Sequence, residues 1–243
     1  LNAAWKNVKQ NKSDTLSNGV IRYSFNGVVA QDTTLQLSAI FHISPDNPVI
    51  KFRYILSTAG ARRFSKKDGK DHLKYFSLKF PTSSDVQEVR LSDYNEKDHA
   101  YSLSEIGVSS SAFENASPLM GPILVNTFGG YTQLVAYEHG SQYPNRFLEY
   151  QLSPEKLVTL HAVKGNYLNK QLLDPGHPYE TIWCHVAGIK GKTEHMASSY
   201  RKFVLKFMAE YNASRVPYIF YHTWGRQERV KWAGGTYLSS MNL

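Results

Sequence analysis

A period of two in hydrophobicity dominates the sequence up to about residue 190. Apolar residues alternate with polar ones at 21–25, 35–43 and 50–56, and further strand-like runs lie at 73–80, 86–91, 123–128, 131–137, 146–152, 157–163 and 179–187. Because successive side chains of a strand point to opposite faces, this alternation predicts half-buried strands. Turn sequences such as Asn18-Gly19 and Gly129-Gly130 separate the runs. Since no helical crossovers intervene, about ten antiparallel strands in a large β-sandwich are predicted.

The period changes to that of a helix near residue 193. Apolar and aromatic residues then recur at spacings of four, three, four and four: Met196, Tyr200, Phe203, Phe207 and Tyr211. These spacings place the side chains on one face of an amphipathic helix. We expect Thr193 to be its N-cap and Asn212 to end it.

A nearly continuous apolar run, residues 216–221, follows the predicted helix. Such a run is typical of a strand covered on both faces, as in a parallel sheet or a barrel. Each parallel neighbour needs a crossover of about a dozen residues or more, and only 19 residues follow Trp224. We therefore expect the chain to be a piece of a longer protein, cut after the first strand of a second domain.

Charge and composition bear on the class of function. The formal net charge of +8 raises nucleic-acid binding as an alternative. The basic cluster at 62–70 lacks any zinc-finger, RNA-binding or basic-heptad pattern, so a solvated loop is the simpler interpretation. No apolar stretch approaches the ~18–20 residues of a membrane span. Aromatic residues make up 13% of the chain, which favours strands and surfaces for stacking flat ligands such as sugar rings.

No catalytic or metal-binding motif is recognisable from spacing alone. The histidines at 139, 161, 177, 185 and 195 are scattered over different predicted elements. Neither a Gly-x-Ser-x-Gly elbow nor a phosphate-binding loop occurs. The single cysteine, Cys184, excludes an internal disulfide and lies in an apolar run, so we expect a buried, unreactive thiol.

The segment Arg215-Val216-Pro217-Tyr218-Ile219-Phe220-Tyr221-His222-Thr223-Trp224 resembles the domain junction of α-galactosidases of the melibiase type. In that family (glycoside hydrolase clan D, family thirty-six-like), a polar-Thr/Ser-Trp motif ends the first strand of a (β/α)8 barrel. Earlier segments are similar to the family in the same order: 122–124 with 136–142, 173–176 with 179–181, and 188–191 with 196–197 and 200–203. The resemblance covers residues 118–243.

The resemblance implies an organisation in three parts. Residues 1–192 would form a large antiparallel β-supersandwich of the galactose-mutarotase type, 193–213 a linker helix, and 214–243 the start of a truncated (β/α)8 catalytic barrel. The implied activity is retaining hydrolysis of terminal α-galactosyl residues, without a metal or organic cofactor. The two catalytic Asp residues would lie beyond Leu243, so the fragment alone should be inactive.

The resemblance also implies partners. These are an α-galactoside or related glycan as substrate, the remainder of the chain's own catalytic barrel, and a further copy in a homo-oligomer, because such N-terminal domains often contribute oligomer contacts. Neither nucleic acid nor a membrane is among them.

Trp224 is the residue whose role carries over from the family. Its indole would lie at the carboxyl end of the first barrel strand and pack on galactose, the alternative being a core Trp at the barrel rim. His222 stands where the family commonly has Asn, which puts that Asn's hydrogen bond in doubt. Arg226 would rim the pocket unless it is a solvated loop residue. The polar stretch around His139 and Asn145-Arg146 either faces the barrel or forms a polar hairpin.

Two other classes stay open at this point. A non-catalytic carbohydrate-binding or interaction sandwich would bind sugars on exposed aromatic residues, but it would not need a strand at 216–224. A nucleic-acid binder would need the basic cluster to extend across one face of the molecule.

Overall fold

The computed structural model describes residues 4–65, 73–95, 100–138, 147–163 and 170–208, together with Trp232 and Gly234. The chain divides into two compact units, Leu1–Met208 and Ala209–Leu243. All elements named below belong to the first unit. Strands dominate it, so the prediction of a mostly β chain with a large antiparallel sheet is confirmed.

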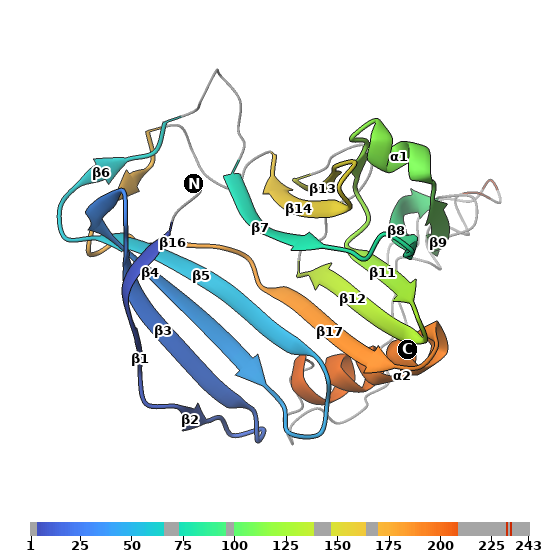
Figure 1. The fold of residues 1–243 in the computed structure, drawn as a ribbon, viewed down its shortest axis with the longest axis horizontal. Helices are drawn as coiled ribbons and strands as arrows, with labels where there is room; N and C mark the ends of the chain where they lie inside the picture. Colours follow the sequence, from blue (N-terminus) through green and yellow to red (C-terminus); the bar gives the residue numbers. More distant parts are fainter. Residues whose placement is uncertain are drawn as a thin grey trace. The chain divides into compact units, whose positions relative to one another are not determined.

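One antiparallel sheet of eleven strands forms the centre of the described residues (Figure 1). Nine strands follow one another across it: β1 (Trp5–Gln10), β3 (Ile21–Val29), β4 (Asp32–Ile43), β5 (Ile50–Thr58), β17 (Cys184–Lys190), β12 (Tyr131–Tyr137), β11 (Ile123–Phe128), β8 (Asp85–Asn95) and β9 (Ala100–Val108). The short strands β2 (Asp14–Thr15) and β16 (Tyr179–Glu180) pair with β3 and β5. Strand β17 therefore joins the N-terminal strands to the later ones.

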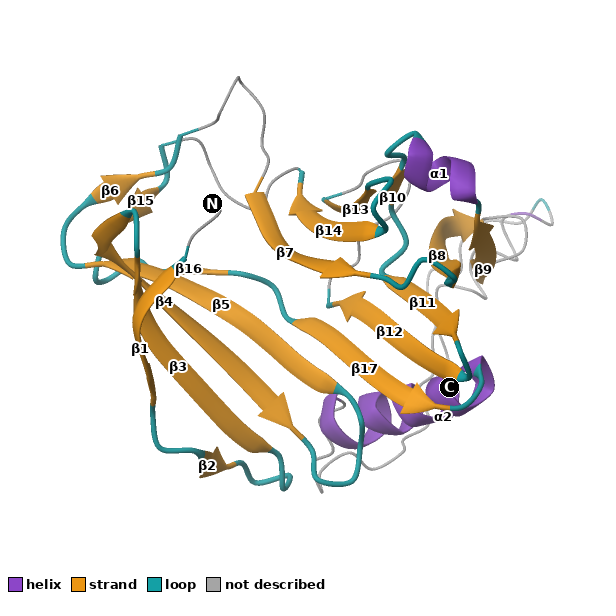
Figure 2. Ribbon diagram, viewed as in Figure 1, coloured by secondary structure: helices purple, strands orange, loops and turns teal. Residues whose placement is uncertain are grey.

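A smaller antiparallel sheet packs on one face of the large sheet, which we call the inner face (Figure 2). Its strand order is β10 (Pro118–Leu119), β13 (Leu148–Leu152), β14 (Leu157–Ala162) and β7 (Leu73–Lys79). Tyr150 of the smaller sheet and Phe52 of the large one belong to a single buried cluster. Helix α1 (Ser110–Glu114) adds Phe113 to this core, and β6 (Arg62–Arg63) pairs with β15 (Leu172–Leu173).

The opposite, outer face is covered over β12 and β17 by helix α2 (Thr193–Phe203) and the π-helical turn η1 (Val204–Met208). Met196 and Phe203 of α2 pack there against Leu134 and Ala136 of β12. Side chains on both faces of β12 are therefore buried, because its even-numbered residues face the helix and its odd-numbered residues face the smaller sheet.

The predicted amphipathic helix is confirmed as far as Met208, but its predicted N-cap is wrong. Thr193 is the first helical residue, and Lys192 is the N-cap, without a side-chain cap bond. Tertiary hydrogen bonds hold the helix entry instead, because Thr132 Oγ1 donates to the Gly191 carbonyl and Gly191 N–H donates to the Gly130 carbonyl. The predicted stop, Asn212, lies outside the described residues.

The predicted strands at 123–128 and 131–137 are confirmed with the same bounds. The predicted strand at 179–187 is wrong in its middle, because β16 ends at Glu180 and β17 begins at Cys184. Between them, Thr181 Oγ1 accepts a hydrogen bond from Tyr54 N–H and Thr181 N–H donates to the Tyr54 carbonyl. The ladder to β5 thus accommodates one extra residue, as in a β-bulge.

Strand β9 was missed by the sequence analysis. Among the described strands it pairs only with β8, at one end of the path across the sheet, and its Leu103 is 61% exposed. An edge strand that leaves its apolar residues in solvent lacks the alternation on which the prediction rests.

Candidate functional site

The residues that the sequence singled out for the site lie in the second unit. Trp224, His222 and Arg226 are all outside the described residues, as are His139 and Asn145-Arg146. Their roles stay predictions. The structure instead reveals two features of the first unit that the sequence analysis missed, one on each face of the large sheet.

The first feature is a polar chain on the outer face that links strand to helix. Glu138, directly after β12, accepts a hydrogen bond from Lys51 Nζ at 2.6 Å, and its Oε1 lies 2.8 Å from His185 Nε2. The other ring nitrogen of His185 lies 2.9 Å from the Tyr200 hydroxyl of α2. In a neutral imidazole one nitrogen donates and the other accepts. All groups are satisfied when Nε2–H donates to Glu138 and Tyr200 O–H donates to Nδ1.

The charge states of Glu138 and Tyr200 in this hydrogen-bonded row follow from their surroundings. Burial alone would raise the pKa of Glu138, but hydrogen bonds from His185 and Lys51 outweigh it and hold the pKa below its usual value. Burial, helped by the charge of Glu138, raises the pKa of Tyr200. Glu138 is therefore an anion and Tyr200 a neutral donor. The hydrogen bonds through His185 thus fasten α2 to β17.

An indole extends this polar chain along the outer face. Trp183 lies in the step between β16 and β17, and both Lys51 Nζ and Arg53 Cζ lie 4.6 Å from the centre of its ring. The ring of His42 lies 4.7 Å from it. Arg53 also pairs with Glu180. A cation over an indole is attracted by the negative face of the ring, and the attraction is stronger when the cation is partly desolvated.

We call this set the outer-face cluster: His42, Lys51, Arg53, Glu138, Trp183, His185 and Tyr200. Its histidine at position 42 is neutral, because burial and the nearby charges of Lys51, Arg22 and Arg53 lower the pKa to about 4. The alternation places Lys51 and Arg53 on the polar face of β5. Only the strand order, however, brings Lys51 beside both His42 and His185.

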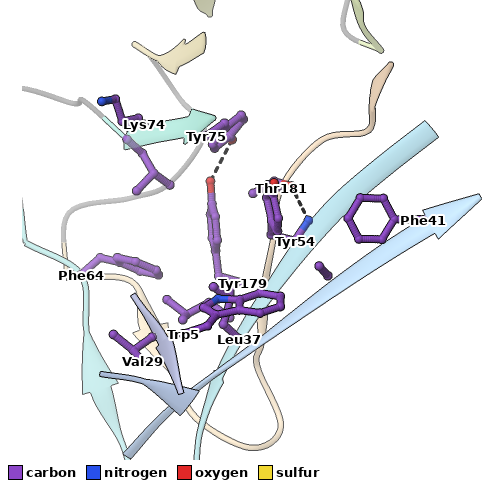
Figure 3. Close-up of a pocket in the computed structure, with 13 residues that line it drawn as sticks. Trp5, Val29, Leu37, Phe41, Tyr54, Phe64, Lys74, Tyr75, Tyr179 and Thr181 are labelled. Atoms are coloured by element: carbon purple, nitrogen blue, oxygen red, sulfur yellow. Dashed lines mark hydrogen bonds between the residues drawn. The ribbon is translucent and has the colours of Figure 1, made fainter. Parts of the chain in front are cut away.

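The second feature is a cavity of about 460 Å³ on the inner face. Figure 3 shows its aromatic lining, which consists of Trp5, Phe41, Tyr54, Phe64, Tyr75 and Tyr179. The hydroxyls of Tyr75 and Tyr179 share a hydrogen bond of 2.9 Å that joins β7 to β16. The only sequence signal for this cavity is the high aromatic content, which does not say where the rings gather.

Two further observations concern metals and membranes. Within the described ranges, no group of three or more His, Cys, Asp or Glu side chains could hold a metal ion. No helix among the same residues has the length and apolarity to cross a membrane. Cys184 is buried as expected, and burial raises the pKa of its thiol well above the ordinary value.

Comparison with solved structures places this arrangement among known folds. The galactosidase domain of an α-galactosidase-sucrose kinase covers 82% of this chain with a TM-score of 0.53 at 10% identity, and the chain covers 29% of it. The α-galactosidase AgaA of Geobacillus stearothermophilus, of glycoside hydrolase family 36, gives 0.52 at 12% identity, with coverages of 82% and 29%. The α-galactosidase of Lactobacillus brevis gives 0.51 at 10% identity, with 83% and 29%.

The fold is that of the N-terminal domain of family 36 α-galactosidases. At these identities the similarity concerns the fold, and this chain spans less than a third of each enzyme. No protein-family model and no curated protein matches the sequence. The resemblance drawn from residues 118–243 is thus confirmed for the family 36 fold, whereas the predicted barrel strand lies outside the described residues.

Proposed function

We propose that this chain is the N-terminal portion of a retaining α-galactosidase that hydrolyses terminal α-galactosyl residues of oligosaccharides or glycans. The observation that supports it is the family 36 fold over 82% of the chain. In this proposal residues 1–192 are the β-supersandwich, 193–213 the linker helix and 214–243 the start of the catalytic barrel. The catalytic Asp pair lies in the part of the barrel that follows.

The proposed substrate class rests on the same relatives. Variants of AgaA have been solved with raffinose and with stachyose. We assign α-galactosides of this kind to the parent protein. Trp224 packs on the apolar face of the galactose ring, His222 is a substrate-binding residue at the position of the family's Asn, and Arg226 lies at the rim of the pocket. The proposed hydrolysis uses neither a metal nor an organic cofactor.

The outer-face cluster has a role in this proposal. Helix α2 and the turn η1 end the first unit, and the chain enters the second unit at Ala209. The hydrogen bonds from Glu138 through His185 to Tyr200 fix α2 on the sheet. They therefore stabilise the end of the first unit, from which the chain continues into the proposed barrel.

The test compares two lengths of the protein from its native gene, the 243-residue chain and a version extended through the complete barrel. With 4-nitrophenyl α-galactoside and raffinose, the extended protein should release galactose initially as the α-anomer, as seen by NMR. The 243-residue chain should be inactive, because both carboxylates are missing. Activity of the short chain, abolished by one substitution within it, would overturn the proposal, as would an extended protein inactive on every α-galactoside.

A further inference from the structure

The cavity on the inner face has no part in the proposed glycosidase function. It is walled by β4 and β5 on one side and by the start of β7 on the other, with Trp5 of β1 and Phe64 beside them. Its volume of about 460 Å³ falls within the ~300–1,000 Å³ range of small-molecule sites. The cavity is also partly open to solvent, so a small molecule can enter it.

The lining restricts the chemistry of that occupant. Among the thirteen described residues that line it, Lys74 alone is charged, and its amine points away from the rings (Figure 3). Asp, Glu, Asn, Gln and Arg do not occur among these thirteen described residues. A sugar needs a polar partner for most of its hydroxyls, whereas the described lining offers mainly apolar surface and a few hydroxyls, so an apolar ligand suits these walls better. A fatty acid would bring a carboxylate to a cavity in which the described cation, Lys74, points outward.

The aromatic rings are held in place before any ligand arrives. The Tyr75–Tyr179 hydrogen bond ties two of them together, and the ring of Phe64 meets Tyr179 edge-on at 5.2 Å between centroids. Tyr54 is fixed through its backbone by Thr181. Fixed rings favour a flat partner, because aromatic pairs gain from offset-stacked and edge-to-face contacts, and prior ordering lowers the cost of binding.

We propose that this cavity binds a planar, uncharged aromatic small molecule with two or three fused rings (about the size that a cavity of this class takes). The inference is independent of the glycosidase function, since it needs only the first unit of the chain. Its occupant would lie between Ala39 of β4 and the rings of Tyr75 and Tyr179.

The test titrates the 243-residue chain with 2-naphthol by calorimetry, with dodecanoate and galactose as comparison probes. Ala39 is 2% exposed and lies in the lining, so Ala39→Phe fills the cavity. The matched control is Ile40→Phe, which adds the same ring at the next position of β4, on the opposite face. The wild-type chain and Ile40→Phe should bind one equivalent of 2-naphthol. Ala39→Phe should bind at least ten-fold more weakly while keeping its near-ultraviolet circular dichroism.

A second measurement locates the probe. 2-Naphthol should shift the indole N–H signal of Trp5 in the NMR spectrum, assigned by its loss in Trp5→Phe. If Ala39→Phe fails to fold, Ala39→Leu replaces it and should weaken binding about three-fold. Equal binding by wild type and the folded cavity variant, a Trp5 signal that does not move, or absence of saturable binding would overturn the proposal. So would saturable binding of dodecanoate or galactose with none of 2-naphthol.

Discussion

His185 and Tyr200 are joined by a hydrogen bond of 2.9 Å between β17 and α2. The imidazole is fully buried, with 0% of its surface exposed, and its other nitrogen is bound to Glu138. The ring of Phe203 meets it edge-on at 5.1 Å. A single side chain therefore couples the polar and the apolar contacts that hold the helix on the outer face of the sheet.

Removing this imidazole should destabilise the first unit more than removing one of its bonds. His185→Ala empties a fully buried position and removes the hydrogen bonds that the half-buried Glu138 and Tyr200 make to the ring, although Glu138 keeps Lys51, and we expect a cost of about 2–4 kcal/mol. Tyr200→Phe removes only the hydroxyl and keeps the ring, so about 1 kcal/mol is expected. Urea unfolding followed by circular dichroism measures both. Equal losses in the two variants would contradict the proposed hydrogen-bond chain.

Gly121 should not tolerate a side chain. A Cβ there would overlap the Val89 carbonyl oxygen and lie 2.7 Å from Glu88 Cγ. The Glu88 carboxylate, 1% exposed, accepts hydrogen bonds from Met120 N–H at 2.8 Å and Gly121 N–H at 2.7 Å. Gly121→Ala should therefore cost about 2–3 kcal/mol through overpacking. Gly107→Ala, where a Cβ meets open space, is the matched control and should change stability by less than about 1 kcal/mol.

Acid should weaken the fold through His42 before the carboxylates titrate. Folding lowers the pKa of His42 from 6.5 to about 4, through burial first and then through Lys51, Arg22 and Arg53, opposed by Asp14. The unfolded chain then binds a proton that the folded chain does not, so stability is complete above pH 6.5 and declines as the pH falls toward 4. A shift of this size at a half-buried, partly screened site corresponds to about 1–2 kcal/mol.

The variant His42→Gln isolates this contribution. Its stability should stay nearly flat between pH 6.5 and about 4.5, whereas that of the wild type falls. Glu138 acts in a lower range, because its lowered pKa contributes stability that is lost only as the pH falls below the ordinary value of 4.5. Parallel pH profiles of wild type and His42→Gln would remove His42 as the cause.

The first unit should fold without the second. The division of the chain falls between Met208 and Ala209, and α2 makes its buried contacts with β12 and β17. A chain ending at Met208 should therefore keep its β-rich circular dichroism, with a melting temperature within a few degrees, as for a ~1 kcal/mol change. Loss of cooperative unfolding in the shortened chain would show that residues 209–243 are integral to the domain.

Trp224 should matter for catalysis in the extended enzyme. Trp224→Ala removes the apolar surface on which galactose packs and loosens its positioning. We expect kcat/KM for an α-galactoside to fall by ~100-fold, or ~2.7 kcal/mol, and Trp224→Phe to retain part of it. Near-normal kcat/KM per folded molecule with a sharply lower melting temperature would instead identify a core residue at the barrel rim.

Local pattern was enough to predict the elements whose signals are local. The hairpin of β11 and β12 follows from two strand-like runs that flank Gly129 and Gly130, both with positive φ (52° and 80°), which glycine adopts at little cost. Helix α2 follows from the spacing of Met196, Tyr200 and Phe203. The fold family followed from short motifs in the correct order, because each motif is contiguous in the chain.

The tertiary structure alone decided which residues meet. Lys51, Glu138 and His185 come from three separate strand regions, and they converge because β17 inserts between β5 and β12. The aromatic cavity likewise depends on where β7 of the smaller sheet lies over β4 and β5. Alternation states that a side chain faces inward or outward, but it carries no information on strand order. Long-range pairing is set by the summed burial of whole faces, so the outer-face cluster and the cavity appear only once the sheets are assembled.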